Sequence, residues 1–191
     1  MRILGELISD LTGGDSEQAE RAAIELPEHG KQGIAALQSL LHSSDAGERW
    51  WATRTLAGFQ DAEAGQLLVA TLDDADIGVR YCAALSLGKQ PHLTAVPTLI
   101  GALDSGDTLL ARLAADALAA TGAAAVEPLI SVLEGGTPTA RVEAARTLAL
   151  IGDTRAIPTL FKLLDSDSIS LQHWANEGLD KMGVGMSFFH P

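Results

Sequence analysis

The sequence contains a single cysteine, Cys82, so a disulfide bond within the chain is excluded. A zinc site built from several cysteines is excluded for the same reason. The five histidines are scattered and form neither an HxxxH nor an HExxH spacing. The nucleophile motif GxSxG and the phosphate-binding motif GxxxxGKS (or GKT) are also missing. We therefore expect no metal, no cofactor and no catalytic residue in this chain, and no enzyme activity by the chain alone.

Positive charge is scarce as well. Thirteen Lys and Arg stand against 25 Asp and Glu, which gives a net charge of -12. Because a nucleic-acid partner requires a positive face, we expect no nucleic-acid binding. No run reaches the roughly 18 uninterrupted apolar residues of a membrane helix, and the N-terminal segment meets Glu6 too early for a signal peptide. We expect a cytoplasmic protein that binds no membrane.

Aromatic residues make up only 4% of the chain, and alanine and leucine dominate its apolar positions in a repeating pattern. The pattern Ala-x-x-x-Leu recurs six times in steps of 30 or 31 residues, starting at Ala22, Ala52, Ala83, Ala114, Ala144 and Ala175. The pattern Leu-x-x-x-Leu alternates with it at the same steps, starting at Leu7, Leu37, Leu68, Leu99, Leu129 and Leu160. Because residues i and i+4 share one face of a helix, each pattern predicts a helix with a buried stripe.

Capping residues agree with this division. A side chain able to accept a first-turn N–H stands before each Ala/Leu helix. These candidates are Asp15 or Ser16, Asp45, Asp76, Asp107, Thr137, and Asp167 or Ser168. Glycine follows each Ala/Leu helix and suits a chain reversal with positive φ. These glycines are Gly30, Gly58, Gly88, Gly122, Gly152 and Gly183.

The repeat predicts an all-α fold, a right-handed α-solenoid of about 12 helices with a period of about 31 residues. We expect a single domain over residues 1–191. Half a repeat, residues 2–12, opens it, and five helix pairs follow over residues 15–166. A second half-repeat, residues 168–182, closes the stack, and an apolar tail covers residues 183–191.

Two stretches resemble a known family. One runs from Val79-Arg80 through Ala83-Ala84 to Ala95-Val96-Pro97-Thr98-Leu99-Ile100. The other runs from Arg141 through Ala144-Ala145 and Ile151-Gly152-Asp153 to Ala156-Ile157-Pro158-Thr159-Leu160. This pattern resembles the HEAT-like repeat of the phycobilisome-lyase type over nearly the whole chain. The resemblance implies a structural ladder in which Arg49, Arg80 and Arg141 pair with turn aspartates, with Asp61 and Asp153 as the acceptors.

A few residues interrupt the Ala/Leu monotony. Trp50 and Trp51 begin one Ala/Leu helix, and Trp50 points away from its core stripe at 100° per residue. Tyr81 and Arg112 occupy the position of Trp50 in the next two repeats. Since these residue types are enriched in binding hot spots, the four residues are candidate partner contacts, the alternative being partial burial between helices.

The tail holds two further candidates, Phe188 and Phe189. They either cover the end of the stack or insert into a partner or a second copy, which would allow a homo-oligomer through the tail or the stack ends. We expect a non-catalytic scaffold or adaptor that binds another protein. The alternative, implied by the resemblance alone, is a subunit of a bilin lyase-like chromophore-attachment complex.

Overall fold

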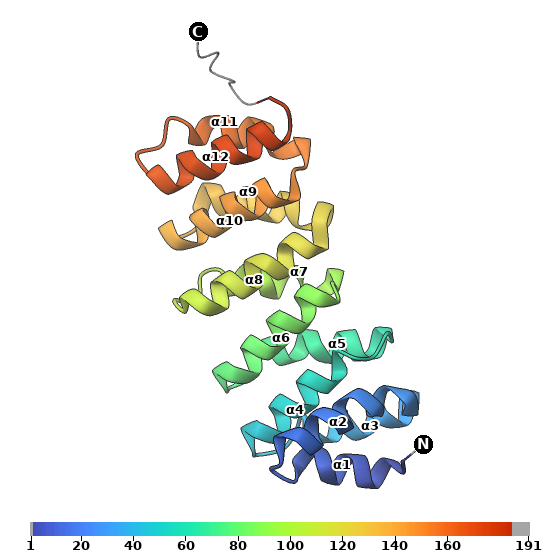
Figure 1. Cartoon of the computed structure of the whole chain (residues 1–191). Helices are drawn as coiled ribbons and strands as arrows, with labels where there is room; N and C mark the ends of the chain where they lie inside the picture. Colours follow the sequence, from blue (N-terminus) through green and yellow to red (C-terminus); the bar gives the residue numbers. More distant parts are fainter. Residues whose placement is uncertain (1, 185–191) are drawn as a thin grey trace. The chain divides into compact units, whose positions relative to one another are not determined.

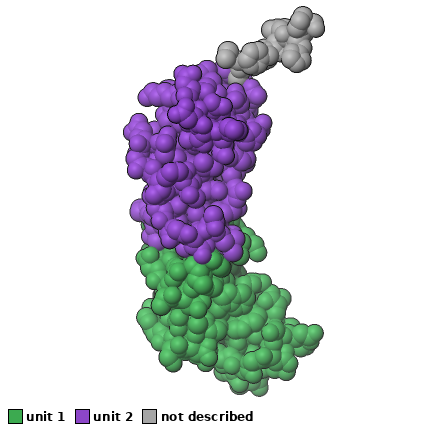
Figure 2. Space-filling view, turned by 90° about the vertical axis from the view of Figure 1, so that its left-hand side faces the viewer, with its two compact units in different colours: residues 1–94 green, residues 95–191 purple. Residues whose placement is uncertain are grey.

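The computed structural model describes residues 2–184, and every regular element in that range is helical (Figure 1). Twelve α-helices and five short 3-10 turns make up the described chain. The expectation of an all-α chain with about 12 helices is therefore confirmed. The contacts divide the chain into two compact units, residues 1–94 and 95–191, which are described separately (Figure 2). The single-domain expectation stays a prediction.

The first unit contains six α-helices. They are α1 (Leu4–Thr12), α2 (Ser16–Glu25), α3 (Gly30–Leu40), α4 (Ala46–Leu56), α5 (Ala62–Ala70) and α6 (Ile77–Lys89). The 3-10 turns η1 (Leu26–His29) and η2 (Thr71–Asp73) follow α2 and α5. Helix α1 packs on α2, α3 on α4, and α6 on both α4 and α5. The unit is therefore a row of antiparallel hairpins, as the alternating ladders predict.

The second unit repeats this plan. Its α-helices are α7 (Val96–Ala102), α8 (Thr108–Thr121), α9 (Val126–Gly135), α10 (Pro138–Ile151), α11 (Ile157–Leu163) and α12 (Ile169–Lys181). The 3-10 turns η3 (Leu93–Ala95), η4 (Gly122–Ala125) and η5 (Thr154–Ala156) precede α7, α9 and α11. Helix α10 packs on α8, α9 and α12, while α11 packs on α12.

The two ladders form the core. We call α2, α4, α6, α8, α10 and α12, which carry the Ala/Leu pattern, the A helices, and the odd-numbered α-helices the B helices. All twelve residues of the Ala/Leu ladder are at most 1% exposed. In the Leu/Leu ladder, only Leu41 and Leu164 are half-buried, and the other members are buried. Alanine lets helices approach closely while leucine fills the remaining space, so the pattern accounts for the packing.

Every A helix begins at a predicted cap. Each capping side chain accepts a backbone N–H two or three residues ahead, which satisfies a donor that the first turn leaves free. The caps are Asp15, Asp45, Asp76, Asp107, Thr137 and Ser168. The structure thus selects Asp15 over Ser16 and Ser168 over Asp167.

The glycine turns follow the expectation only in part. Gly122 and Gly152 end α8 and α10 with φ of 62° and 70°, a backbone region that favours glycine. The expectation of positive φ is wrong for Gly58 and Gly88, which are not among the positive-φ glycines of the described residues. Gly88 remains helical because α6 continues to Lys89.

Candidate partner-binding surface

Two of the three ladder arginines, Arg49 and Arg80, hold the turns that precede their own helices. The Arg49 guanidinium donates to the carbonyl of Ser43 at 3.0 Å and to the carboxylate of Asp74 at 2.8 Å. Arg80 donates to the backbone carbonyls of Asp74 at 2.6 Å and Ala75 at 3.1 Å. Because these carbonyls have no helical partner, the arginines stabilise the loops between repeats.

The expected acceptors of this ladder are wrong. Asp61 accepts from the backbone N–H of Glu63 and caps α5, while Asp153 binds Arg155 and caps η5. The Arg155 guanidinium and backbone N–H hold the pKa of Asp153 at about 2. Both aspartates lie at the start of a helical element, where the nearest free donors are the first-turn N–H groups. Asp74, in the turn after η2, takes the acceptor role for Arg49 instead.

The third ladder arginine has a different partner again. Arg141 donates from Nε to the carbonyl of Leu133 at 2.9 Å, near the end of α9. Cations near a helix C-terminus satisfy its free carbonyls and oppose the helix dipole. The three arginines of the expected ladder therefore bind loop carbonyls or the end of a helix.

Trp50, Trp51 and Tyr81 lie close together on the first unit. The rings of Trp50 and Trp51 meet edge to face, with centroids 4.9 Å apart and planes at 87°. Aromatic rings prefer this geometry because the positive edge of one ring faces the negative face of the other. All three aromatic side chains are half-buried, so each keeps part of its surface accessible.

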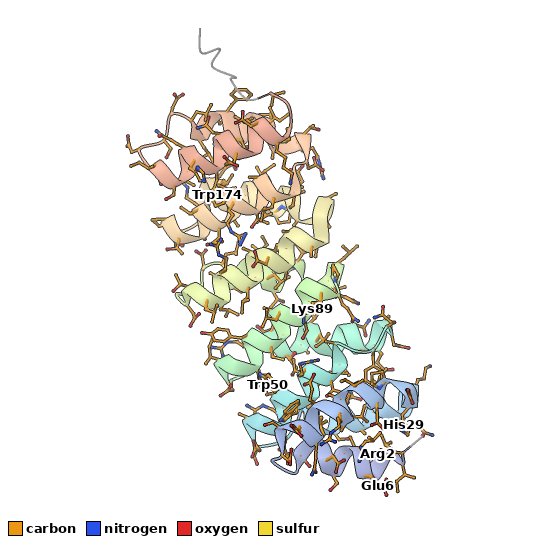
Figure 3. The ribbon with its side chains drawn as sticks, viewed as in Figure 1. Arg2, Glu6, His29, Trp50, Lys89 and Trp174 are labelled. Carbon is orange, nitrogen blue, oxygen red and sulfur yellow. The ribbon has the colours of Figure 1, made fainter. Side chains whose placement is uncertain are left out.

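A groove runs between α4 and α6 beside these aromatics. Its volume is about 410 Å³, within the range of ligand pockets. Helix α4 and the turn after it contribute Trp50, Arg54, Ala57 and Gly58, and α6 contributes Gly78, Tyr81, Cys82, Leu85, Ser86 and Lys89. Trp50 and Lys89 lie toward opposite ends of this α4–α6 groove (Figure 3).

The structure thus brings Trp50 and Tyr81 to one site, together with groove residues that the sequence analysis missed. Leu85 is 52% exposed, although most of its surroundings are apolar. Arg54 forms an ion pair with Glu20 of α2, and Lys89 is exposed at the end of α6. A signal for Leu85 existed in the repeat: its equivalents one, two and three repeats later are Asp116, Arg146 and Glu177. Leu85 is therefore an apolar residue at a position that is charged in the three repeats after it and in the one before it, Arg54, although the first repeat has Ile24 there.

Cys82 closes one wall of the groove but is not activated. Burial raises the pKa of its thiol to about 11, and the nearby Ser86, Arg54 and Lys89 only partly oppose this effect. The thiolate is the nucleophilic form of cysteine, and it is scarce at neutral pH when the pKa is this high. Cys82 therefore packs as a small, largely buried side chain.

Arg112, the fourth expected contact, belongs to the second unit. It forms an ion pair with Glu143 at 3.4 Å, and the same carboxylate lies 3.5 Å from Arg146. Arg146 also pairs with Asp116. Burial raises the pKa of Glu143, an effect that Arg112 opposes. Arg112 therefore joins α8 to α10.

The second unit also contains one segment apolar enough to be compared with a membrane helix. Within Thr108–Gly135, an 18-residue window has a mean hydropathy of 1.5. In the structure, Gly122 turns the chain at φ 62° and splits the segment into α8 and α9, of 14 and 10 residues. Neither helix reaches the roughly 20 residues that span a bilayer, and 44% of the apolar window is buried in the fold.

Over residues 2–184, no three His, Cys, Asp or Glu side chains are grouped so that they could hold a metal ion. Phe188 and Phe189, the expected tail contacts, lie outside the described residues. Of the expected contacts, Trp50 and Tyr81 line one groove, so the α4–α6 groove is the candidate partner-binding surface.

Similar proteins place this fold in a family. A model of HEAT repeats matches residues 34–119, 65–134 and 126–185. The phycocyanobilin lyase subunit beta of Thermosynechococcus vestitus is 36% identical over 85 residues, which cover 44% of this chain and 40% of that protein. The phycobilisome maturation protein of Synechococcus elongatus is 34% identical over 119 residues, covering 60% and 56%. The chain thus spans 40% and 56% of the length of these two relatives.

Solved structures agree on the fold. The complex of CpcE and CpcF of phycocyanin lyase from a Nostoc species aligns with a TM-score of 0.56 at 24% identity, covering 96% of this chain and 78% of that one. The archaeal HEAT-like repeats protein of Thermococcus onnurineus aligns with a TM-score of 0.65 at 15% identity, covering 95% and 81%. Both likenesses support the expected solenoid class. With the family model matching most of its length, the chain belongs to the HEAT-repeat family.

Proposed function

We propose that this chain binds a second protein as one subunit of a bilin lyase-like complex and contributes binding rather than chemistry. The observation that carries the proposal is its similarity to proteins named as phycocyanobilin lyase subunits, both alpha and beta. The relatives therefore favour the second of the two functions expected from the sequence. The solved lyase structure is a complex of two proteins, which supports a paired role for this chain as well.

The surface of the first unit supports the binding role. Aromatic side chains and arginine are enriched at the energetic centres of protein interfaces. Trp50, Tyr81 and Arg54 line the same groove together with the apolar Leu85. A helical repeat supplies such a surface without a catalytic centre, since each helix pair adds exposed area while the ladders bury the core.

A co-purification experiment tests the proposal. The tagged chain is expressed in its native host, purified, and analysed by size-exclusion chromatography with light scattering. Phycocyanobilin is then added, and the visible spectrum of each peak is recorded. We expect a stoichiometric complex with a second repeat protein, and a shifted bilin band that elutes with the complex.

The outcomes separate the two functions expected from the sequence. A stoichiometric complex without a bilin band would indicate a general scaffold. A chain that elutes alone and shifts no bilin absorbance would contradict the proposal. The same light-scattering measurement on the isolated chain tests self-association through its ends or through residues 183–191, which stays a prediction together with a cytoplasmic location.

A further inference from the structure

Among the described residues, charged side chains join neighbouring A helices within each unit, except between α4 and α6, where the Cys82 thiol lies 4.0 Å from the carbonyl oxygen of Trp50. Arg54 of α4 pairs with Glu20 of α2, and Arg146 of α10 pairs with Asp116 of α8. Lys181 of α12 donates to the carbonyl of Leu150 of α10. Between α4 and α6, by contrast, the described residues form no ion pair, and the α4–α6 groove lies there.

The walls of the groove are apolar at a position where four of the six repeats carry a charged residue. Leu85 is 52% exposed and stands one repeat before Asp116, which pairs with Arg146. Trp50 and Tyr81 border it with half-buried rings. Exposing these groups to water is unfavourable, and clustered apolar surface of this kind marks an interaction site.

The charge of the groove is opposite to that of the chain. Its lining contains two cations, Arg54 and Lys89, and no carboxylate, although the chain has 25 Asp and Glu against 13 Lys and Arg. Arg54 is held by Glu20, whereas Lys89 forms no ion pair with any described residue. A negatively charged group on a bound partner can therefore pair with Lys89.

We propose that the α4–α6 groove binds a segment of a partner protein in which an aromatic or leucine side chain stands next to an aspartate or glutamate. The apolar side chain packs between Trp50, Tyr81 and Leu85, and the carboxylate pairs with Lys89. This proposal rests on the protein-binding part of the proposed function and names the face of the chain that carries it. The groove volume of about 410 Å³ suits one large side chain and the backbone beside it.

The test uses a phage library of random peptides about twelve residues long, selected against the full chain. We expect the enriched peptides to share a Phe, Tyr, Trp or Leu within two residues of an Asp or Glu. A synthetic peptide of the enriched sequence is then titrated by following tryptophan fluorescence. Its affinity should fall when its acid is replaced by the amide and when the salt concentration is raised.

Variants assign the binding to the groove. Leu85→Ser should weaken the peptide about 10-fold or more, because it removes apolar contact area. Lys89→Gln should weaken it about 2- to 5-fold and remove most of the salt dependence. The matched controls are Leu150→Ser, at a leucine that is 46% exposed and does not line the groove, and Lys162→Gln, at an exposed lysine outside it. Both controls should bind the peptide as the original chain does.

Three results would overturn the proposal: no enriched peptide, enriched peptides that lack the acid, or equal binding by Leu85→Ser and the original chain. Circular dichroism of each variant shows whether it is folded. If the native complex forms and both groove variants leave it intact, the groove proposal fails while the proposed function stands. If a partner protein binds through the groove but no bilin band elutes with the complex, the lyase-like part of the proposed function fails and the groove proposal stands.

Discussion

Arg49 donates two hydrogen bonds to the carboxylate of Asp74, from Nε at 2.8 Å and from Nη2 at 2.9 Å. The side chains are only 14% and 11% exposed, so solvent screens this pair less than most surface ion pairs. The Arg49 hydrogen bonds lower the pKa of Asp74, partial burial opposes them, and the backbone N–H of Asp76 lowers it further. The pair links α4 to the turn before α6.

Asp74→Asn should therefore destabilise the first unit, by about 1 to 2 kcal/mol. Since the pKa of Asp74 is lower in the folded chain, its contribution is complete above the ordinary value near 3.8 and disappears as the pH falls through the lowered pKa. Urea unfolding at pH 7 and pH 3 measures this. The variant should lose less stability on acidification than the original chain, whereas exposed Asp73→Asn should behave like the original.

Buried and exposed leucines of one helix should differ strongly. In α8, Leu118 is fully buried and Leu109 is 51% exposed. Leu118→Ala should lower the free energy of unfolding by about 2 to 5 kcal/mol, because it removes buried contacts and leaves a cavity. Leu109→Ala should change it by no more than about 0.5 kcal/mol. Similar losses in urea unfolding for the two variants would argue against the ladder as the core.

Alanine substitutions at two glycines should change the free energy of unfolding in opposite directions. A Cβ on Gly178 of α12 would lie 2.9 Å from Leu160 Cδ1 and 3.1 Å from Ala149 Cβ, so Gly178→Ala should destabilise by about 1 to 3 kcal/mol. A Cβ on Gly101 of α7 meets nothing within 4 Å, and its φ is not positive. Gly101→Ala should therefore stabilise by about 0.5 to 1 kcal/mol. Thermal melts of both variants measure the difference.

Cys82 should resist thiol reagents in the folded chain. Burial raises its pKa from 9.0 to about 11, which reduces the thiolate fraction at pH 8 roughly 100-fold. We expect slow release of the chromophore from a disulfide reagent at pH 8, and fast release after unfolding in urea. Equal rates in the folded and unfolded chains would show that the thiol is accessible, which would contradict the burial of Cys82 in the groove wall.

Much of the fold could be predicted because its signals are local. The i, i+4 ladders set the helices, and Asp45 or Thr137 needs only its own first turn to act as a cap. The acceptor of Arg49 could not be predicted in this way. Asp74 lies 25 residues further along the chain, and its selection over Asp61 depends on how η2 directs the following turn.

The sequence predicts no groove, and of the residues that line it, only Trp50 and Tyr81 are expected partner contacts. Trp50 and Tyr81 stand out by residue type, whereas Leu85 is one of many leucines and differs from its charged equivalents in most other repeats. Lys89 is a candidate contact because no carboxylate lines the same groove, and the sequence of α6 alone does not contain that information. Those relations depend on packing between two helices, which a pattern within one helix does not contain.

The short reach of the ion pairs has a consequence for how the chain folds. Glu20 and Arg54 are 34 residues apart, and Asp116 and Arg146 are 30 apart, so each pair joins neighbouring repeats. Proteins dominated by contacts of short sequence separation fold rapidly, because little loop-closure entropy is lost before contacts form. A hairpin such as α3–α4 can therefore close while later repeats are still being synthesised, and the growing chain adds order from its N-terminal end.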